Sequence, residues 1–169
     1  APLEDLYKLI MEKVVSDEGL TQCTFYYRYY LMRALKKAGM GDRYLGMLGP
    51  WRRMLEMGLT TFAEKPEPTR SDCHAWSACP NYDLLSLVCG IEPGAPGFAS
   101  VRIEPSLGPL EWVEGQVATE RGPIRVHLRR DGEAGLQAEV ELPPETKGVR
   151  LWKGKDVPLS SRSQSITLH

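Results

Sequence analysis

The spacing of the hydrophobic residues changes along this chain, and that change constrains the fold more than any other feature. In residues 3–58 and again in 81–89 hydrophobic residues recur every three or four positions, as on one face of a helix. Beyond residue 98 they alternate with polar residues, as in strands with one buried face. Between these parts lies Glu92–Gly97, a Pro- and Gly-rich segment typical of a domain boundary. We therefore predict α+β by segment, with helices in 1–97 and an antiparallel β-sandwich in 98–169.

The first half predicts four helices, over residues 3–15, 21–38, 42–58 and 81–89. Pro50 removes a backbone donor and is expected to kink or split the third helix near Gly49. The side chains expected to face inward are Leu3, Leu6, Ile10, Val14, Tyr27, Tyr30, Leu31, Ala34, Leu35, Ala38, Tyr44, Leu48, Trp51, Leu55, Leu84, Leu85 and Val88.

The second half predicts short strands separated by turns. Gly122-Pro123 and Asp131-Gly132 are turn signals between them. The alternating hydrophobic residues are Val101, Ile103, Ile124, Val126, Leu128, Leu136, Ala138, Val140, Leu142, Val149, Leu151, Ile166 and Leu168.

Composition narrows the class of protein. The chain is 42% hydrophobic and 25% charged, which is typical of a globular protein. Its net charge is -1 and Lys and Arg gather on no segment, so neither nucleic acid nor membrane is an expected partner. Cys73, His74 and Cys79 lack zinc-site spacing, so no metal or cofactor is expected and the cysteines are expected to be free thiols. The compartment stays open.

The segment Leu59–Pro80 has no helical or strand period, and long loops of this kind are often functional. It contains Glu64, Glu67, Asp72, Arg70, His74 and Trp76. Carboxylates and histidine can bind sugar hydroxyls, and an aromatic ring can stack on the apolar face of a sugar. A surface loop with ion pairs would have the same composition, so the residue types alone leave both interpretations open.

The order of residues in this loop resembles a known family. Gly58-Leu59-Thr60-Thr61-Phe62-Ala63-Glu64, followed by Ser71-Asp72-Cys73-His74-Ala75-Trp76-Ser77-Ala78, is similar to the last catalytic segment of bacterial α-L-rhamnosidases. The segment 82–91 and Pro93 continue the resemblance. These enzymes are inverting glycoside hydrolases with an (α/α)6 barrel followed by a C-terminal β-sandwich. The resemblance implies that residues 1–97 are the last helices of the barrel.

The resemblance also implies roles for single residues. Glu64 matches the general base that activates water, His74 matches a histidine that faces the sugar, and Trp76 lies in a matching segment. The general acid of the family lies on an earlier acidic segment that has no counterpart here. We therefore expect a C-terminal fragment that is inactive alone, whose partners are a rhamnose-containing glycan or glycoside and the missing N-terminal part of the same polypeptide.

Several alternatives stay open at this point. Trp76 either stacks on a sugar or packs in the core, and Asp72 either caps the backbone or pairs with Arg70. The chain could instead be a carbohydrate-binding or packing module, for which Trp112 and Trp152 are the available aromatic residues, or part of a different inverting (α/α)6 glycosidase. An exposed helical face would permit self-association.

Overall fold

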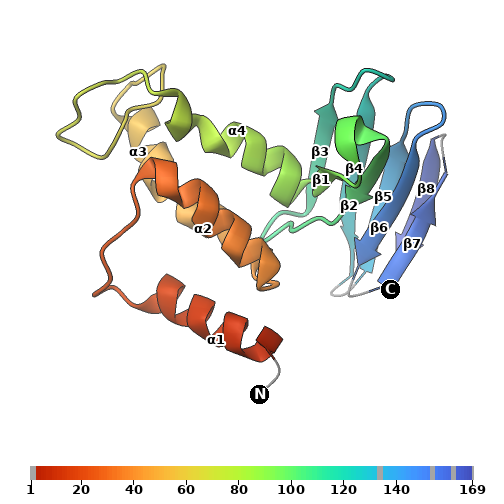
Figure 1. The fold of residues 1–169 in the computed structure, drawn as a ribbon, viewed down its shortest axis with the longest axis horizontal. Coiled ribbons are helices and arrows are strands. Elements are labelled where there is room, and N and C mark those ends of the chain that lie inside the picture. Colours follow the sequence, from red (N-terminus) through yellow and green to blue (C-terminus); the bar gives the residue numbers. More distant parts are fainter. Residues whose placement is uncertain (1–2, 133–134, 153–154, 161–162, 169) are drawn as a thin grey trace. The chain divides into compact units, whose positions relative to one another are not determined.

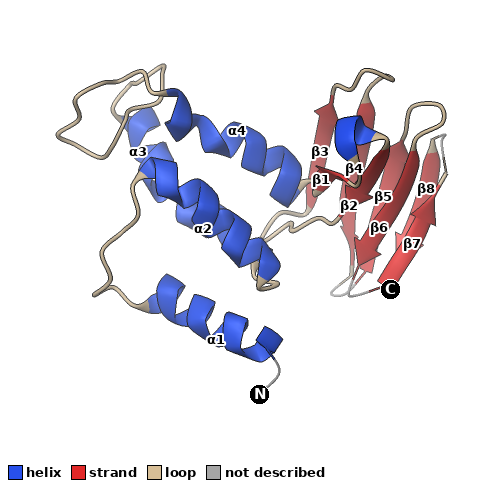
Figure 2. Ribbon diagram, viewed as in Figure 1, coloured by secondary structure: helices blue, strands red, loops and turns tan. Residues whose placement is uncertain are grey.

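A computed structural model describes residues 3–132, 135–152, 155–160 and 163–168. The chain divides into two compact units, Ala1–Asp83 and Leu84–His169. Figures 1 and 2 show that α-helices belong to the N-terminal part and strands to the C-terminal part, which confirms the expected fold class.

The first unit contains the helical elements α1 Leu3–Ser16, α2 Phe25–Lys37, the 3₁₀ helix η1 Gly41–Leu48, α3 Gly49–Glu56, the 3₁₀ helix η2 Ala75–Ala78 and α4 Cys79–Asp83. The predicted third helix is split into η1 and α3, and Pro50 lies in the first turn of α3, as expected. The second helix begins at Phe25 rather than after Thr21, and Thr24 precedes it without a side-chain cap.

The buried face of α2 differs from the predicted one. Phe25, Arg28, Met32 and Leu35 are buried, whereas Tyr27 and Tyr30 are 60% and 52% exposed. The predicted face and the observed face both follow the three- and four-residue spacing of a helix. Periodicity therefore located the helix, but packing selects Phe25 instead of the tyrosines, since the ring of Phe25 lies 5.0 Å from the ring of Trp51.

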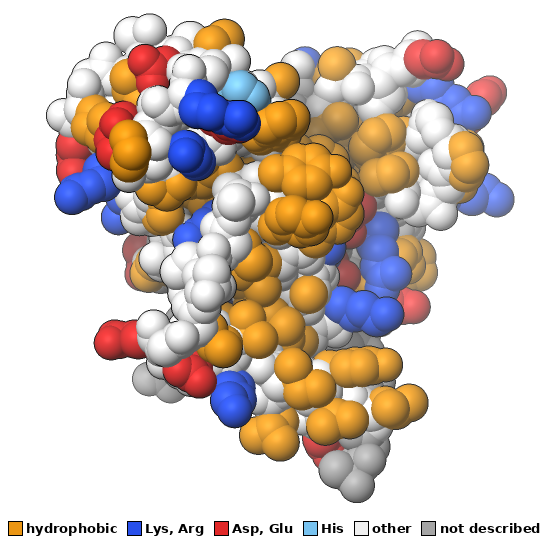
Figure 3. All heavy atoms as spheres, turned by 60° about the vertical axis from the view of Figure 1, so that its left-hand side comes forward, with side chains coloured by type: hydrophobic (Ala, Val, Ile, Leu, Met, Phe, Trp, Pro, Cys, Tyr) orange, Lys and Arg blue, Asp and Glu red, His pale blue; other side chains and the backbone are white. Residues whose placement is uncertain are grey.

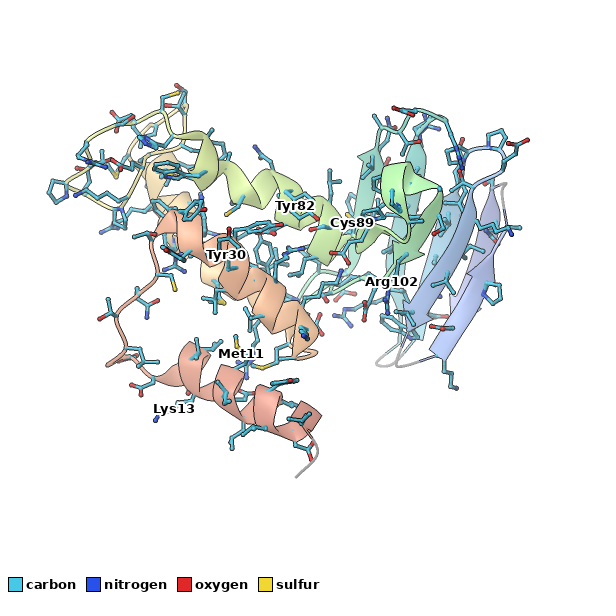
Figure 4. All side chains as sticks on the ribbon, viewed as in Figure 1. Met11, Lys13, Tyr30, Tyr82, Cys89 and Arg102 are labelled. Atoms are coloured by element: carbon cyan, nitrogen blue, oxygen red, sulfur yellow. The ribbon has the colours of Figure 1, made fainter. Side chains whose placement is uncertain are left out.

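Helix α1 also exposes most of its hydrophobic residues. Met11 is buried and points toward α2 (Figure 4), and the ring of Tyr7 lies 5.9 Å from the Lys37 ammonium of α2. Leu84 and Leu55, also expected to face inward, are exposed. Figure 3 shows hydrophobic side chains gathered on the face that it turns forward. The exposed large hydrophobic residues of the first unit are Leu3, Leu6, Tyr7, Leu9, Ile10, Leu20, Tyr26, Tyr27, Tyr30, Leu55, Met57, Trp76 and Tyr82.

One small core holds α2, α3 and the long loop together. Phe25, Trp51, Met54 and Ala63 are its buried members, and partly buried Leu48, Leu59, Phe62 and Cys79 pack against them. The indole nitrogen of Trp51 donates to the backbone oxygen of Ser77 at 2.7 Å. This buried bond ties α3 to η2 and so to the end of the loop.

The described residues of the second unit form the π-helical turn η3 Leu84–Val88, a short 3₁₀ turn η4 Pro96–Phe98 and eight strands. The strands are β1 Ile91–Pro93, β2 Ser100–Ile103, β3 Trp112–Val117, β4 Ile124–Asp131, β5 Gly135–Glu141, β6 Lys147–Trp152, β7 Lys155–Leu159 and β8 Gln164–Leu168. They form two four-stranded sheets, ordered β1-β2-β6-β7 and β3-β4-β5-β8. The sequence indicated no separate strands for β1, β3 and β7.

One strand pair departs from the expected antiparallel pattern. Strands β2 and β6 are parallel, with Val101 opposite Gly148 and Ile103 opposite Arg150. Parallel neighbours need a long connection, and here the chain makes β3, β4 and β5 of the other sheet between them. The other described pairings are antiparallel.

Two glycines allow the start of the second unit to pack closely. Gly90 has φ +75°, and a Cβ there would lie 2.2 Å from the carbonyl carbon of Glu104. A Cβ on Gly115 would lie 2.6 Å from the sulfur of Cys89. Because Leu87 is buried and its carbonyl accepts from the Ser106 amide at 3.1 Å, residues 84–97 belong with the strands in packing. The chain divides into its compact units at 83/84, and the predicted domains, barrel helices in 1–97 and a β-sandwich in 98–169, stay a prediction.

Candidate functional site

The long loop leaves α3 through a left-handed glycine. Gly58 has φ +74°, a conformation that favours glycine, and the amide of Leu59 donates to the carbonyl of Met54 at 3.0 Å. Irregular backbone continues to His74, after which η2 and α4 begin. The loop is therefore shorter than the predicted Leu59–Pro80.

The two arms of this loop bond to each other. The amide of Glu64 donates to the carbonyl of Ser71 at 2.9 Å, and the amide of His74 donates to the carbonyl of Phe62 at 2.7 Å. The hydroxyl of Thr61 donates to the carbonyl of Asp72 at 2.5 Å. These bonds bring Glu64 and His74 to neighbouring positions, ten residues apart in sequence.

The carboxylate of Glu64 is held in an ion pair that the sequence did not indicate. Arg70 Nε donates to Glu64 Oε2 at 2.9 Å and Arg70 Nη2 donates to Oε1, so the guanidinium group binds the carboxylate in a bidentate manner. The Glu64 side chain is 9% exposed and that of Arg70 is 76% exposed. The hydrogen bonds from Arg70 lower the pKa of Glu64, helped by the charges of Arg70, His74 and Lys65 against the opposing effect of burial. The carboxylate is thus ionised near neutral pH.

His74 connects this carboxylate to a group of aromatic side chains. Its ring lies 4.5 Å from the ring of Trp76, and Trp76 meets Tyr26 of α2 edge to face at 5.8 Å. The Nδ1 atom of His74 is buried without a hydrogen-bond partner among the described residues. Trp76 is 48% exposed in this chain.

A groove of about 380 Å³ lies beside Trp76. Its lining is mainly aromatic, whereas Glu64 and His74 do not line it. The lining residues are Tyr26, Tyr29, Tyr30, Ala75, Trp76, Ala78 and Cys79. The structure therefore joins Glu64, His74 and Trp76 in one region of the first unit, with an aromatic surface at one side.

Sequence reasoning missed two members of this region. Arg70 was considered a partner of Asp72, but it pairs with Glu64, and the only signal was an arginine within the same loop. Tyr26 lay outside the predicted helical stripe, so nothing in the sequence linked it to Trp76. Asp72 takes part in the loop ties through its backbone carbonyl.

Neither a metal site nor a membrane span is found in the described part of the chain. No three His, Cys, Asp or Glu side chains gather there as metal ligands would. No helix among the same residues combines the length and apolar composition needed to cross a bilayer.

Solved structures share this fold. A native α-L-rhamnosidase from Aspergillus terreus matches with a TM-score of 0.84 and 21% identity over 98% of this chain and 21% of its own. The rhamnosidase of family GH78 from Bacillus sp. GL1 matches with a TM-score of 0.76 and 29% identity over 85% of this chain and 17% of its own. The α-L-rhamnosidase of Streptomyces avermitilis, complexed with L-rhamnose, matches with a TM-score of 0.76 and 20% identity over 95% of this chain and 19% of its own.

The fold of this chain is therefore the fold of one part of a glycoside hydrolase. Residues 90–157 also match the family model of the bacterial alpha-L-rhamnosidase C-terminal domain. The chain is related to the C-terminal part of the GH78 α-L-rhamnosidases, as the loop motifs implied. It spans about a fifth of the length of these structures. No curated protein matches its sequence.

Proposed function

We propose that this chain carries the general base of an inverting glycoside hydrolase that acts on terminal α-L-rhamnosides, and that Glu64 is that base. The observation that carries the proposal is the ionised, nearly buried Glu64 carboxylate beside His74 in a loop closed by its own backbone bonds. A base must be deprotonated to accept a proton from water, and it must be held in place to aim at one water molecule.

The other site residues have binding roles in this proposal. His74 donates to or accepts from a sugar hydroxyl, since its ring nitrogens can do either. Trp76 offers a half-exposed ring for stacking on the apolar face of a sugar. The rhamnose of a glycan or glycoside is therefore bound between the Glu64 carboxylate and the aromatic surface.

Inverting hydrolysis needs a second carboxyl group, a protonated acid on the leaving oxygen, roughly 6.5–9.5 Å from the base so that a water fits between them. We assign this acid to an upstream part of the same polypeptide. The exposed hydrophobic residues of α1 and α2 are consistent with further helices that pack on them, and self-association is the alternative use of that face. The 169-residue chain alone is then inactive.

The test replaces Glu64 with Gln in the full-length polypeptide. Gln cannot accept the proton, so hydrolysis of p-nitrophenyl α-L-rhamnoside should fall by roughly 10²–10⁴-fold while rhamnose binding is retained. Glu67→Gln, at an exposed carboxylate of the same loop, is the matched control and should keep the rate. Unchanged turnover by Glu64→Gln would refute the proposal, and turnover by the 169-residue chain alone would show that it contains the acid. Hydrolysis of another glycoside but not of the rhamnoside would favour a different inverting glycosidase.

A second candidate function is carbohydrate binding by the two-sheet unit. Trp112 on β3 is 54% exposed and its ring meets His127 of β4 edge to face at 6.0 Å, so one aromatic face is open to a sugar. Trp112→Ala should then weaken glycan binding without changing hydrolysis. Equal binding by wild type and variant would leave this unit with a packing role.

A further inference from the structure

We propose that Arg70 is the positioning residue of Glu64: its guanidinium fork fixes the plane of the carboxylate and keeps the base aimed at the water. The inference rests on the proposed role of Glu64 as general base. Arg70 is not assigned a contact with the sugar, and it acts only through Glu64.

The geometry of the pair is that of a bidentate clamp. Each carboxylate oxygen accepts one N–H bond, Oε2 from Nε at 2.9 Å and Oε1 from Nη2. Two bonds fix a carboxylate plane, whereas one bond leaves it free to rotate. Each oxygen has a second lone pair, so both can still accept a bond from water.

The backbone around Arg70 is braced so that the fork reaches Glu64. The carbonyl of Ser71, the next residue, accepts from the Glu64 amide at 2.9 Å and from the Thr69 hydroxyl at 2.9 Å. Ser71 is therefore attached to the loop segment that carries Glu64, and Thr69 is attached to Ser71, so the backbone turn that contains Arg70 is closed on itself. This bracing and the buried carboxylate of Glu64 distinguish the pair from the surface ion pair Arg53–Glu56, in which both side chains are at least 70% exposed.

The charges around Glu64 agree with a positioning role. Arg70, His74 and Lys65 all favour the ionised carboxylate, and the Arg70 hydrogen bonds have the largest effect in lowering the pKa of Glu64. Arginine stays protonated in proteins and cannot itself act as an acid or base. Removal of Arg70 therefore changes both the orientation and the proton affinity of Glu64.

The first experiment follows the Glu64 carboxylate by ¹³C NMR during a pH titration of the 169-residue chain. Arg70→Gln should raise the pKa of Glu64, and Arg70→Lys should raise it less because it keeps the charge but loses the fork. Arg53→Gln, at the exposed pair, should leave it unchanged. Both Arg70 variants should fold, since the side chain is mostly exposed. A Glu64 pKa that is the same in Arg70→Gln and wild type would overturn the inference.

The second experiment measures kinetics in the full-length polypeptide. Arg70→Gln should shift the acidic limb of kcat/KM to higher pH and lower kcat by roughly 10²-fold, with KM unchanged. Because Arg70 acts through Glu64, adding Arg70→Gln to Glu64→Gln should cause no further loss. Additive losses would overturn the positioning role. Full activity of Glu64→Gln would instead overturn the proposed function, whatever the NMR titration shows.

Discussion

Arg33 of α2 and Asp83 of α4 form an ion pair in which the carboxylate is almost completely buried. The side chain of Asp83 is 1% exposed and that of Arg33 is 23% exposed. The guanidinium of Arg33 lies 5.4 Å and 5.1 Å from the ring centroids of Tyr29 and Tyr82, the latter labelled in Figure 4. Burial raises the pKa of Asp83 to about 6 although Arg33 acts in the opposite direction. Desolvation therefore outweighs the attraction within the pair.

The raised pKa of Asp83 predicts a pH dependence of stability. Between the ordinary value of 3.8 and about 6 the folded state binds more protons than the unfolded state. The free energy of unfolding contributed by Asp83 should thus fall as pH rises from 3.8 to 6, by on the order of 3 kcal/mol. Urea unfolding at several pH values should show this fall in the difference between wild type and Asp83→Asn. A difference that increases with pH over the same window would mean that the ion pair dominates.

A buried arginine of β6 predicts a stabilising substitution. Arg150 is fully buried, its three guanidinium nitrogens have no hydrogen-bond partner among the described residues, and it lies 5.6 Å from the ring centroid of Trp152. Burial lowers the pKa of Arg150 to about 10. Arg150→Met keeps the apolar stem and removes the unpaired charge, so it should stabilise the chain by roughly 1–4 kcal/mol. Arg102→Met, at a half-exposed side chain, should change unfolding by less than about 0.5 kcal/mol. Destabilisation by Arg150→Met would show that its charge is compensated.

Gly90 and Gly39 give a matched pair for separating backbone strain from steric contact. Both have a left-handed φ, +75° and +69°, but only at Gly90 would a Cβ meet the backbone of Glu104. Gly39→Ala should cost roughly 1–2 kcal/mol from the left-handed conformation alone. Gly90→Ala should cost clearly more in thermal or urea unfolding. Equal losses would show that the chain near Glu104 yields without cost.

We expect the hydrogen bond of the Thr61 hydroxyl to stabilise the loop that carries Glu64. Thr61→Val keeps the shape but removes the bond to the Asp72 carbonyl, which is worth roughly 0.5–1.5 kcal/mol. Hydrogen exchange at the amides of Glu64 and His74 should become faster, since both amides bond across the same loop. Thr60→Val is the control, because Thr60 is exposed and makes no side-chain hydrogen bond among the described residues. Unchanged exchange in Thr61→Val would place the stability of the loop in its backbone bonds and in Phe62.

Local patterns located most of the elements. The period of three to four residues found the helices that became α1, α2 and the split η1–α3, and Pro50 indicated the split. The period of two found β2, β4, β5, β6 and β8, and in β2, β4 and β5 buried residues alternate with more exposed ones or nearly so. Strands β1 and β7 are short and half-buried, so they lack the alternation that would reveal them.

The sequence by itself determined where the period changes and where glycines end helices, because these depend on neighbours in the chain. It also indicated which loop holds the candidate site, through the resemblance of its residue order to a known family. Only the tertiary structure decided which face of α2 is buried, that residues 84–97 pack with the strands and that Arg70 pairs with Glu64. Each of these depends on the partner that a side chain meets in space. Periodicity predicts that a helix or strand has a buried face, but it does not predict which residues that face contacts.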